Sequence, residues 1–181
     1  MPIDVRDELG MAPLHWLAVE GHCSCVQWLV DEIGADVECP DLLYRQTPLH
    51  FAASKEHPRV AQQLLELRAN PMATDKNGWT PLHTAARSGS AEVAALLLAA
   101  TPAGSANTEG PGGQTPLHRA AFWGHTELVR LLLQHGATRG KLDHRGRQAA
   151  DVACDGGERR GELPDLMKLL RTNETLERAL K

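Results

Sequence analysis

Apolar residues recur along the chain in short blocks with helical spacing, separated by glycine or polar residues. In residues 114–137, Ala120 and Ala121 mark a small-residue face, and Gly124 ends that block. A second block over 127–133 is rich in Leu. Blocks this short predict two helices joined by a tight turn. Such a pair cannot bury its apolar face alone, so we expect it to stack against similar pairs.

The ends of these two helices carry the expected signals. Thr115 can cap the first helix, and Pro116 suits its first position, where a missing N–H costs nothing. Glu127 opens the second helix, where a carboxylate suits the helix dipole. Gly136 fits a left-handed cap after its last turn.

The same block recurs along the chain. Pro-Leu-His begins at residues 13, 48, 81 and 116, so the spacings are 35, 33 and 35 residues. A degenerate fifth copy follows around Gln148 to Asp151. A period of about 33 residues with Thr-Pro-Leu-His is typical of ankyrin repeats. The chain therefore resembles an ankyrin-repeat protein from about Asp7 to Leu170. This resemblance implies an all-α solenoid of five helix-turn-helix repeats with short β-hairpin or turn connections.

We expect one domain over residues 1–181, because this length is usual for one domain and the repeats cover nearly the whole chain. The predicted repeats span about 7–33, 34–67, 68–100, 105–137 and 138–170, and residues 171–181 form a closing, polar helix.

Repeat one departs from the pattern in two ways. Ala12 replaces the capping Thr, and Trp16 and Leu17 are large where small residues are usual. Its second helix places Cys25 and Trp28 on the apolar side, which predicts that both are buried.

Later repeats carry irregular connections. In repeat two the hairpin over 38–46 is one residue longer and lacks Gly, and Glu56 takes the usual Gly position between the helices. Residues 101–113 are rich in Gly and Pro, which predicts a long, mobile hairpin. About five extra residues lie near 155–163.

Composition narrows the class of protein. A hydrophobic fraction of 42% and a charged fraction of 23% are ordinary for a folded domain, and no apolar run is long enough to span a membrane. With no secretory signal, the four cysteines predict reduced thiols in the cytoplasm, with the nucleus as a second location. Residues 1–41 carry a net charge of −8, which disfavours nucleic acid there.

Histidine and cysteine offer the main chemical alternative. Four of the nine histidines share the Thr-Pro-Leu-His position, where the ring is expected to bond to neighbouring backbone and tie repeats together. A metal or catalytic site could use His22, Cys23 and Cys25, but this spacing does not match a paired Cys-x2-Cys zinc pattern. No phosphate loop or nucleophile motif is present, so we expect no catalysis and no cofactor.

The resemblance implies that a partner protein binds across hairpin tips and the ends of first helices, on the concave face. The residues there that are unusually large, or Arg, are Leu42, Leu43, Tyr44, Trp79, Arg87, Phe122, Trp123 and Arg145. Aromatic residues and Arg are common interface anchors. Packing between repeats is the alternative for Phe122 and Trp123, and packing on the turn for Trp79.

The sequence therefore predicts a monomeric adaptor or scaffold for another protein, with no nucleic acid and no membrane as partner. A stoichiometric inhibitor or an assembly chaperone remains the alternative of the same class. A metal-binding or catalytic protein is the alternative of a different class.

Overall fold

The computed structural model describes residues 5–155 and 164–171, and side chains 154 and 155 are outside that description. The chain divides into two compact units, Met1–Pro102 and Ala103–Lys181.

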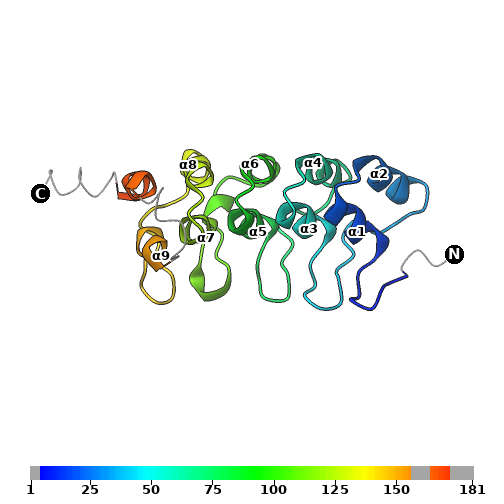
Figure 1. The fold of residues 1–181 in the computed structure, drawn as a ribbon, viewed down its shortest axis with the longest axis horizontal. Helices are drawn as coiled ribbons and strands as arrows, with labels where there is room; N and C mark the ends of the chain where they lie inside the picture. Colours follow the sequence, from blue (N-terminus) through cyan, green and yellow to red (C-terminus); the bar gives the residue numbers. More distant parts are fainter. Residues whose placement is uncertain (1–4, 156–163, 172–181) are drawn as a thin grey trace, which may run out of the picture. The chain divides into compact units, whose positions relative to one another are not determined.

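The N-terminal unit contains three helix pairs, one for each of the first three predicted repeats. Their bounds are α1 Pro13–Glu20, α2 Cys23–Asp31, α3 Pro48–Ser54, α4 Pro58–Glu66, α5 Pro81–Ser88 and α6 Ala91–Ala100. The first helices α1, α3 and α5 form one row and the second helices α2, α4 and α6 form another (Figure 1). Within each row every helix packs on the next one along the chain. The predicted stack of helix pairs is confirmed.

The C-terminal unit continues the pattern. It contains the short 3₁₀ helices η1 Ser105–Asn107 and η2 Pro111–Gly113, and the α-helices α7 Pro116–Phe122, α8 Thr126–Gln134 and α9 Ala149–Asp155. A further helix covers 164–171, as the apolar spacing after Pro164 predicts, with Leu166 and Leu170 buried. Of the predicted extra residues near 155–163, those from 156 on lie outside the described residues, and so does the predicted closing helix over 171–181 except for its first residue.

The Thr-Pro-Leu-His motif builds both the start of a helix and a bond to the next repeat. In repeat three, Thr80 N donates to His83 Nδ1 over 3.3 Å, and His83 N donates to Thr80 Oγ1 over 3.4 Å. Because Nδ1 accepts from the backbone, the ring proton lies on Nε2, which can donate to a second group.

The Nε2 atoms reach the hairpin of the following repeat. His15 Nε2 donates to Gln46 O over 3.1 Å, and His50 Nε2 donates to Trp79 O over 3.0 Å. His118 makes the corresponding 3.1 Å bond to the carbonyl of residue 147. Burial lowers the pKa of these three imidazoles, which keeps the rings neutral. The predicted role of this histidine in tying repeats together is confirmed for them.

The core combines small residues between first helices with leucines on second helices. Ala52 and Ala85 are completely buried between α1, α3 and α5, where only a methyl group allows such close packing. Leu64 and Leu97 are completely buried on α4 and α6. Each buried Leu side chain contributes roughly 2 kcal/mol through removal of apolar surface from water.

The connections between repeats are turns. No β-strand forms anywhere in 5–155 or 164–171, although a hydrogen bond closes each hairpin, such as that from Asp75 N to Trp79 O (2.9 Å). The long hairpin expected over 101–113 folds into η1 and η2. Asn107 Nδ2 donates to Gly136 O over 2.8 Å, and Thr138 N donates to Asn107 Oδ1 over 2.7 Å. These bonds tie the segment to the end of α8.

The prediction that Cys25 and Trp28 are buried is wrong. Both side chains are exposed, and Val26 is the only residue of α2 that is fully buried. The helix positions are correctly assigned. These side chains stay exposed because α2 packs on α1 and α4, and among the described residues no other helix packs on it.

Candidate protein-binding surface

An aspartate at the start of the turn holds the hairpin tips of repeats one, two, three and five. In repeat three, Asp75 Oδ1 accepts hydrogen bonds from Asn77 N (2.8 Å) and Trp79 N (2.9 Å). In repeat five, Asp143 Oδ1 accepts from Arg145 N (2.9 Å) and Arg147 N (3.0 Å). One carboxylate therefore fixes several backbone amides and gives the tip a single conformation.

The hairpin of repeat two has one additional residue, as predicted. Asp41 N bonds to Gln46 O over 2.9 Å, so five steps separate the closing pair where repeat three has four. Arg45 adopts a positive φ of 55°, and Gly78 takes the corresponding place in repeat three. A side chain at positive φ is strained by about 1 kcal/mol or more. The hairpin is therefore held in shape by bonds elsewhere.

The extra length presents three consecutive apolar side chains, Leu42, Leu43 and Tyr44, which we name the repeat-two tip. They are 68%, 50% and 56% exposed. Asp41 Oδ2 accepts from Leu43 N (3.0 Å) and Tyr44 N (2.9 Å).

Bonds to both neighbouring hairpins hold the repeat-two tip further. Leu42 N donates to Gly10 O over 3.3 Å, and Lys76 N donates to Tyr44 O over 2.7 Å. A Cβ added at Gly10 would lie 2.4 Å from Leu42 Cβ, so the first of these approaches requires glycine. The tip is consequently an ordered backbone that carries exposed apolar groups.

Trp79 packs on the turn and is also partly exposed at the surface. Its ring is half-buried and packs edge-on against His83, with ring centroids 5.2 Å apart. Its backbone bonds to Asp75 and accepts from His50. These contacts support packing on the turn, while part of the indole stays accessible.

The two candidate arginines are exposed and lie in different units. Arg87 lies in the last turn of α5, where a cation suits the carbonyl end of the helix. Arg145 lies at the tip of the hairpin before α9. The adjacent His144 N donates to Gly112 O over 2.8 Å, which fixes this tip against the hairpin of repeat four.

Phe122 and Trp123 end α7, and their rings pack on each other at 5.5 Å in an edge-to-face arrangement. They are 39% and 45% exposed, so much of each ring faces solvent. Repeat two has Ser54 and Lys55 at the same two positions. The fold therefore does not require an aromatic pair there.

The structure brings the predicted residues together in groups. Leu42, Leu43 and Tyr44 form one cluster, next to the hairpin that contains Trp79. Phe122 and Trp123 form a separate pair in the C-terminal unit. No contact between this pair and Arg145 is seen in the described part of the chain.

Two ion pairs lie near the hairpin that contains Arg145. Arg147 Nη2 lies 2.9 Å from Asp143 Oδ2. Burial would raise the pKa of Asp143, but the bonds from Arg147 and Arg145 outweigh it and lower that pKa. Lys141 Nζ lies 3.0 Å from Glu109 Oε1, and its hydrogen bond lowers the pKa of that carboxyl.

The alternative metal site gains no geometric support. Within the described residues, no three His, Cys, Asp or Glu side chains lie close enough to hold an ion. Cys23 Sγ instead donates to Gln63 Oε1 over 2.7 Å, and Cys39 is buried.

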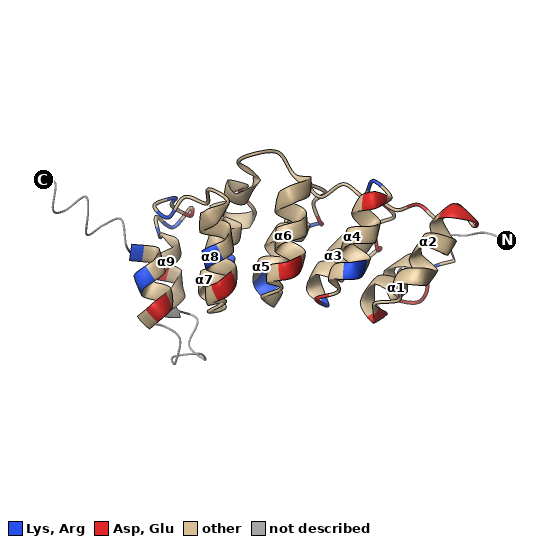
Figure 2. Ribbon diagram, turned by 90° about the horizontal axis from the view of Figure 1, so that it is seen from above, with Lys and Arg blue, Asp and Glu red and all other residues tan. Residues whose placement is uncertain are grey.

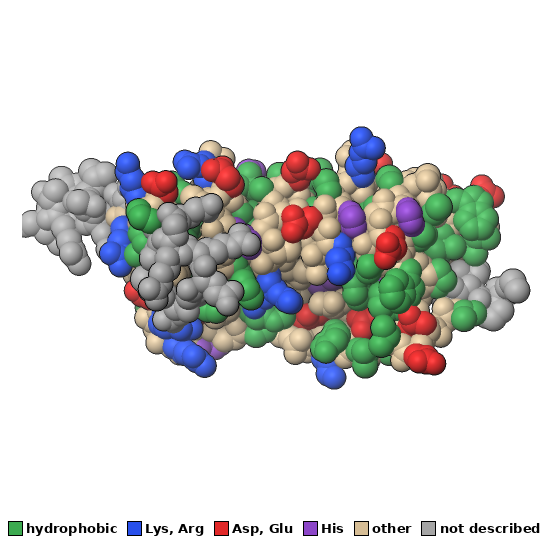
Figure 3. Space-filling view, viewed as in Figure 1, with side chains coloured by type: hydrophobic (Ala, Val, Ile, Leu, Met, Phe, Trp, Pro, Cys, Tyr) green, Lys and Arg blue, Asp and Glu red, His purple; other side chains and the backbone are tan. Residues whose placement is uncertain are grey.

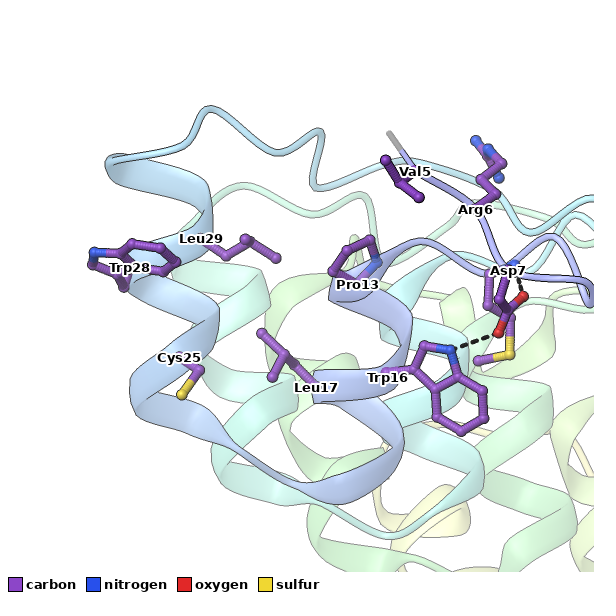
Figure 4. Close-up of a pocket in the computed structure, with 10 residues that line it drawn as sticks. Val5, Arg6, Asp7, Pro13, Trp16, Leu17, Cys25, Trp28 and Leu29 are labelled. Atoms are coloured by element: carbon purple, nitrogen blue, oxygen red, sulfur yellow. Dashed lines mark hydrogen bonds between the residues drawn. The ribbon is translucent and has the colours of Figure 1, made fainter. Parts of the chain in front are cut away.

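Sequence reasoning missed an apolar surface at the first repeat, which we name the open end: Pro13, Trp16, Leu17, Cys25, Trp28 and Leu29. These side chains line a hollow of about 580 Å³ together with Val5, Arg6, Asp7 and Met11 (Figure 4). The large side chains of Trp16 and Leu17 at positions that are small in other repeats were the sequence signal for this surface.

Among the described residues, no helix has both the length and the apolar character needed to cross a membrane.

Comparison with known proteins agrees with the repeat geometry. Residues 14–104 match the family described as ankyrin repeats (3 copies), and residues 112–144 match a single ankyrin repeat. Chicken inversin is 37% identical over 106 residues, which is 59% of this chain and 9% of inversin. Human B-cell lymphoma 3 protein is 35% identical over 57% of this chain and 23% of that protein.

A third relative, the nuclear factor NF-kappa-B p105 subunit of chicken, is 34% identical over 54% of this chain and 10% of that protein. The chain thus spans less than a quarter of the length of each of these three relatives. Motif register, stacked helix pairs and family match agree: the chain belongs to the ankyrin-repeat family.

Proposed function

We propose that this protein is a non-catalytic adaptor or scaffold that captures a partner protein on the face made by its hairpin tips and first-helix ends. Ankyrin repeats are protein–protein interaction modules, and the chain is built from them. The binding mechanism is shape and side-chain complementarity, without cofactor or turnover. We place the protein in the cytoplasm or nucleus, as a monomer that binds neither nucleic acid nor membrane.

The observation that carries this proposal is the repeat-two tip. Three consecutive large apolar side chains are exposed on a backbone already held by Asp41, Gly10 and Lys76. A fixed loop loses little conformational entropy when it binds, so more of the contact energy becomes affinity. Exposed apolar and aromatic residues on such a support are typical of interface centres.

Phe122 and Trp123 support a second anchor. Their edge-to-face packing orders both rings before a partner arrives, and their exposed faces remain available. Trp79 and Arg87 in the N-terminal unit and Arg145 in the C-terminal unit are further candidate contacts, because Trp79 is partly accessible and both arginines are exposed.

Affinity purification with quantitative mass spectrometry tests the proposal. Leu43→Glu should reduce recovery of the specific partner by about tenfold or more, equivalent to about 1.4 kcal/mol. Leu142→Glu is the matched control, because Leu142 is an equally exposed leucine (53%) beside a hairpin aspartate. Phe122→Ala with Trp123→Ala tests the second anchor.

Circular dichroism should show that each variant keeps its helices. A partner recovered equally by the wild type, Leu43→Glu and the aromatic double variant would overturn the proposed surface.

A further inference from the structure

The open end consists of residues whose counterparts in later repeats are buried. Repeat register pairs Pro13 with Pro48 and Pro81, Leu17 with Ala52 and Ala85, Cys25 with Val60 and Val93, and Leu29 with Leu64 and Leu97. All eight counterparts are buried. In repeat one, Pro13 and Cys25 are exposed, and Leu17 and Leu29 are half-buried.

The difference lies in which described helices cover these positions. In repeats two and three these positions lie under the helices of the preceding repeat, since α3 packs on α1 and α4 on α2. Among the described residues, no helix covers the corresponding face of α1 and α2. An end repeat is usually polar on its outer face. Here that face is apolar, and Leu17 stands where a covered repeat needs Ala.

The shape of the open end suits a helix. Leu29 projects from α2 toward Pro13 and Leu17 of α1, and the Trp28 ring lies on the side of α2 that is away from α1 (Figure 4). Trp28 is 55% exposed. Hydrophobic side chains are visible on the surface of this end of the N-terminal unit (Figure 3). A hollow of about 580 Å³ is large enough for several apolar side chains, and helices fill the same positions in repeats two and three.

The position of Trp16 is already fixed. Trp16 Nε1 donates to Asp7 Oδ2 over 2.8 Å, and Asp7 Oδ1 accepts from Met11 N over 2.9 Å. The indole therefore lies in a defined orientation at the edge of the hollow, as one wall of a preformed site.

The charge around the open end is acidic. Described residues 5–41 contain eight Asp or Glu against Arg6 alone, a net of −7. Arg6 Nη1 donates to the carbonyls of Gly10 and Pro40, which hold it in place. Helices α1 and α2 contain no Lys or Arg, and acidic residues lie where both helices end (Figure 2). Helix carbonyl ends add partial negative charge there.

We propose that the open end docks a basic amphipathic helix from a partner protein, whose apolar stripe takes the place of a preceding repeat. Lys or Arg on its flanks would meet the carboxylates at the ends of α1 and α2. A second copy of this chain fits less well, because two ends of net charge −7 would repel each other. The residues that line this surface do not include the repeat-two tip, so the proposal concerns a different site from the proposed adaptor surface.

A defined peptide is the probe. It is a fluorescein-labelled helix of about 18 residues with Leu at i, i+3, i+4 and i+7 spacing and Lys elsewhere. One control peptide has the same composition in an order without a stripe, and another has Glu in place of Lys. Fluorescence anisotropy with the full chain should show one-to-one binding of the Leu/Lys helix, about tenfold tighter than either control.

Substitutions in the chain locate the binding site. Trp28→Ser should weaken binding of the Leu/Lys helix by about fivefold or more. Trp123→Ser, which removes an exposed tryptophan elsewhere, and Leu43→Glu at the repeat-two tip should leave it unchanged.

Two results would overturn the inference. The first is binding that ignores the apolar stripe or falls equally for Trp28→Ser and Trp123→Ser, which would indicate non-specific attraction. The second is a concentration-dependent dimer in sedimentation velocity that Trp28→Ser converts to monomer, which would make a second copy the occupant. Loss of peptide binding in Leu43→Glu would instead merge this site with the proposed adaptor surface.

Discussion

Repeat one and repeat three share the Pro-Leu-His motif, but their helices differ in whether another repeat covers them. Their first helices, α1 and α5, are both eight residues long and begin at the same proline. Yet Cys25 is exposed, while Val93 at the same register position is completely buried. The helical pattern alone therefore determines which face is apolar, and the neighbouring repeat determines whether that face is buried from solvent.

Side-chain size in the two repeats follows the same difference. Ala85 is completely buried and Leu17 is half-buried at equivalent positions. A covered position has room only for a methyl group, whereas an uncovered one accepts a larger side chain. Bulk at a position that is small in other repeats is therefore a sequence signal for an uncovered end.

The strongest test places a charge at both positions. Val93→Asp should lower the free energy of unfolding by about 3 to 5 kcal/mol, because it buries an unpaired carboxylate. Cys25→Asp should change it by only about 0.5 kcal/mol, because the side chain stays in water. Urea unfolding followed by circular dichroism measures both. A loss of similar size for the two variants would mean that Cys25 is covered in solution.

A smaller effect on stability comes from backbone strain, which does not depend on whether a neighbouring repeat covers the helices. Gly21 and Gly89 lie between the helices of repeats one and three at φ of 80° and 92°, and Glu56 takes this place in repeat two at 60°. Glu56→Gly should raise the unfolding free energy by about 1 kcal/mol, because glycine adopts positive φ without steric strain.

Glu56→Ala is the control for that substitution, since alanine keeps the Cβ and should give no comparable gain. A thermal melt of both variants decides the matter. Stabilisation of equal size by alanine would show that the glutamate side chain, and not the backbone, causes the strain.

The smallest expected effect is a pH dependence of the unfolding free energy. It tests whether the following repeat covers repeat one. Burial lowers the pKa of His15 in repeat one as it does for His50 in repeat two, below the ordinary value of 6.5. Unfolding restores proton affinity, so stability is fully present above pH 6.5 and falls as pH drops below it toward the folded-state pKa.

His15→Gln and His50→Gln should each reduce this dependence between about pH 7 and pH 5 by a similar amount. Urea midpoints measured across that range provide the slope. If the slope is unchanged in His15→Gln only, the first histidine is open to solvent and the following repeat does not protect it.

Much of the fold could be predicted because the determinants are local. The Thr-Pro-Leu-His motif, helix spacing and repeat period locate the helix pairs without long-range information. The order of residues 101–113 could not be predicted in this way. It depends on Asn107 bonding to Gly136 and Thr138, about thirty positions along the chain.

The candidate surface was predictable in part for the same reason. The exposure of Leu42, Leu43 and Tyr44 follows from their place in a hairpin, and the structure agrees. The bonds that hold that hairpin could not be predicted, because Leu42 and Tyr44 bond to Gly10 and Lys76 in the neighbouring repeats. The open end was missed because an apolar pattern carries no information about what lies opposite it.

The histidine bond between repeats has a consequence for how such a protein can change over time. The acceptor in the next hairpin is a backbone carbonyl, at Gln46, Trp79 and Arg147. Every residue type supplies that oxygen, so three unrelated side chains satisfy the same junction. A substitution at one of these positions can therefore change the side chain and still leave the bond between the two repeats in place.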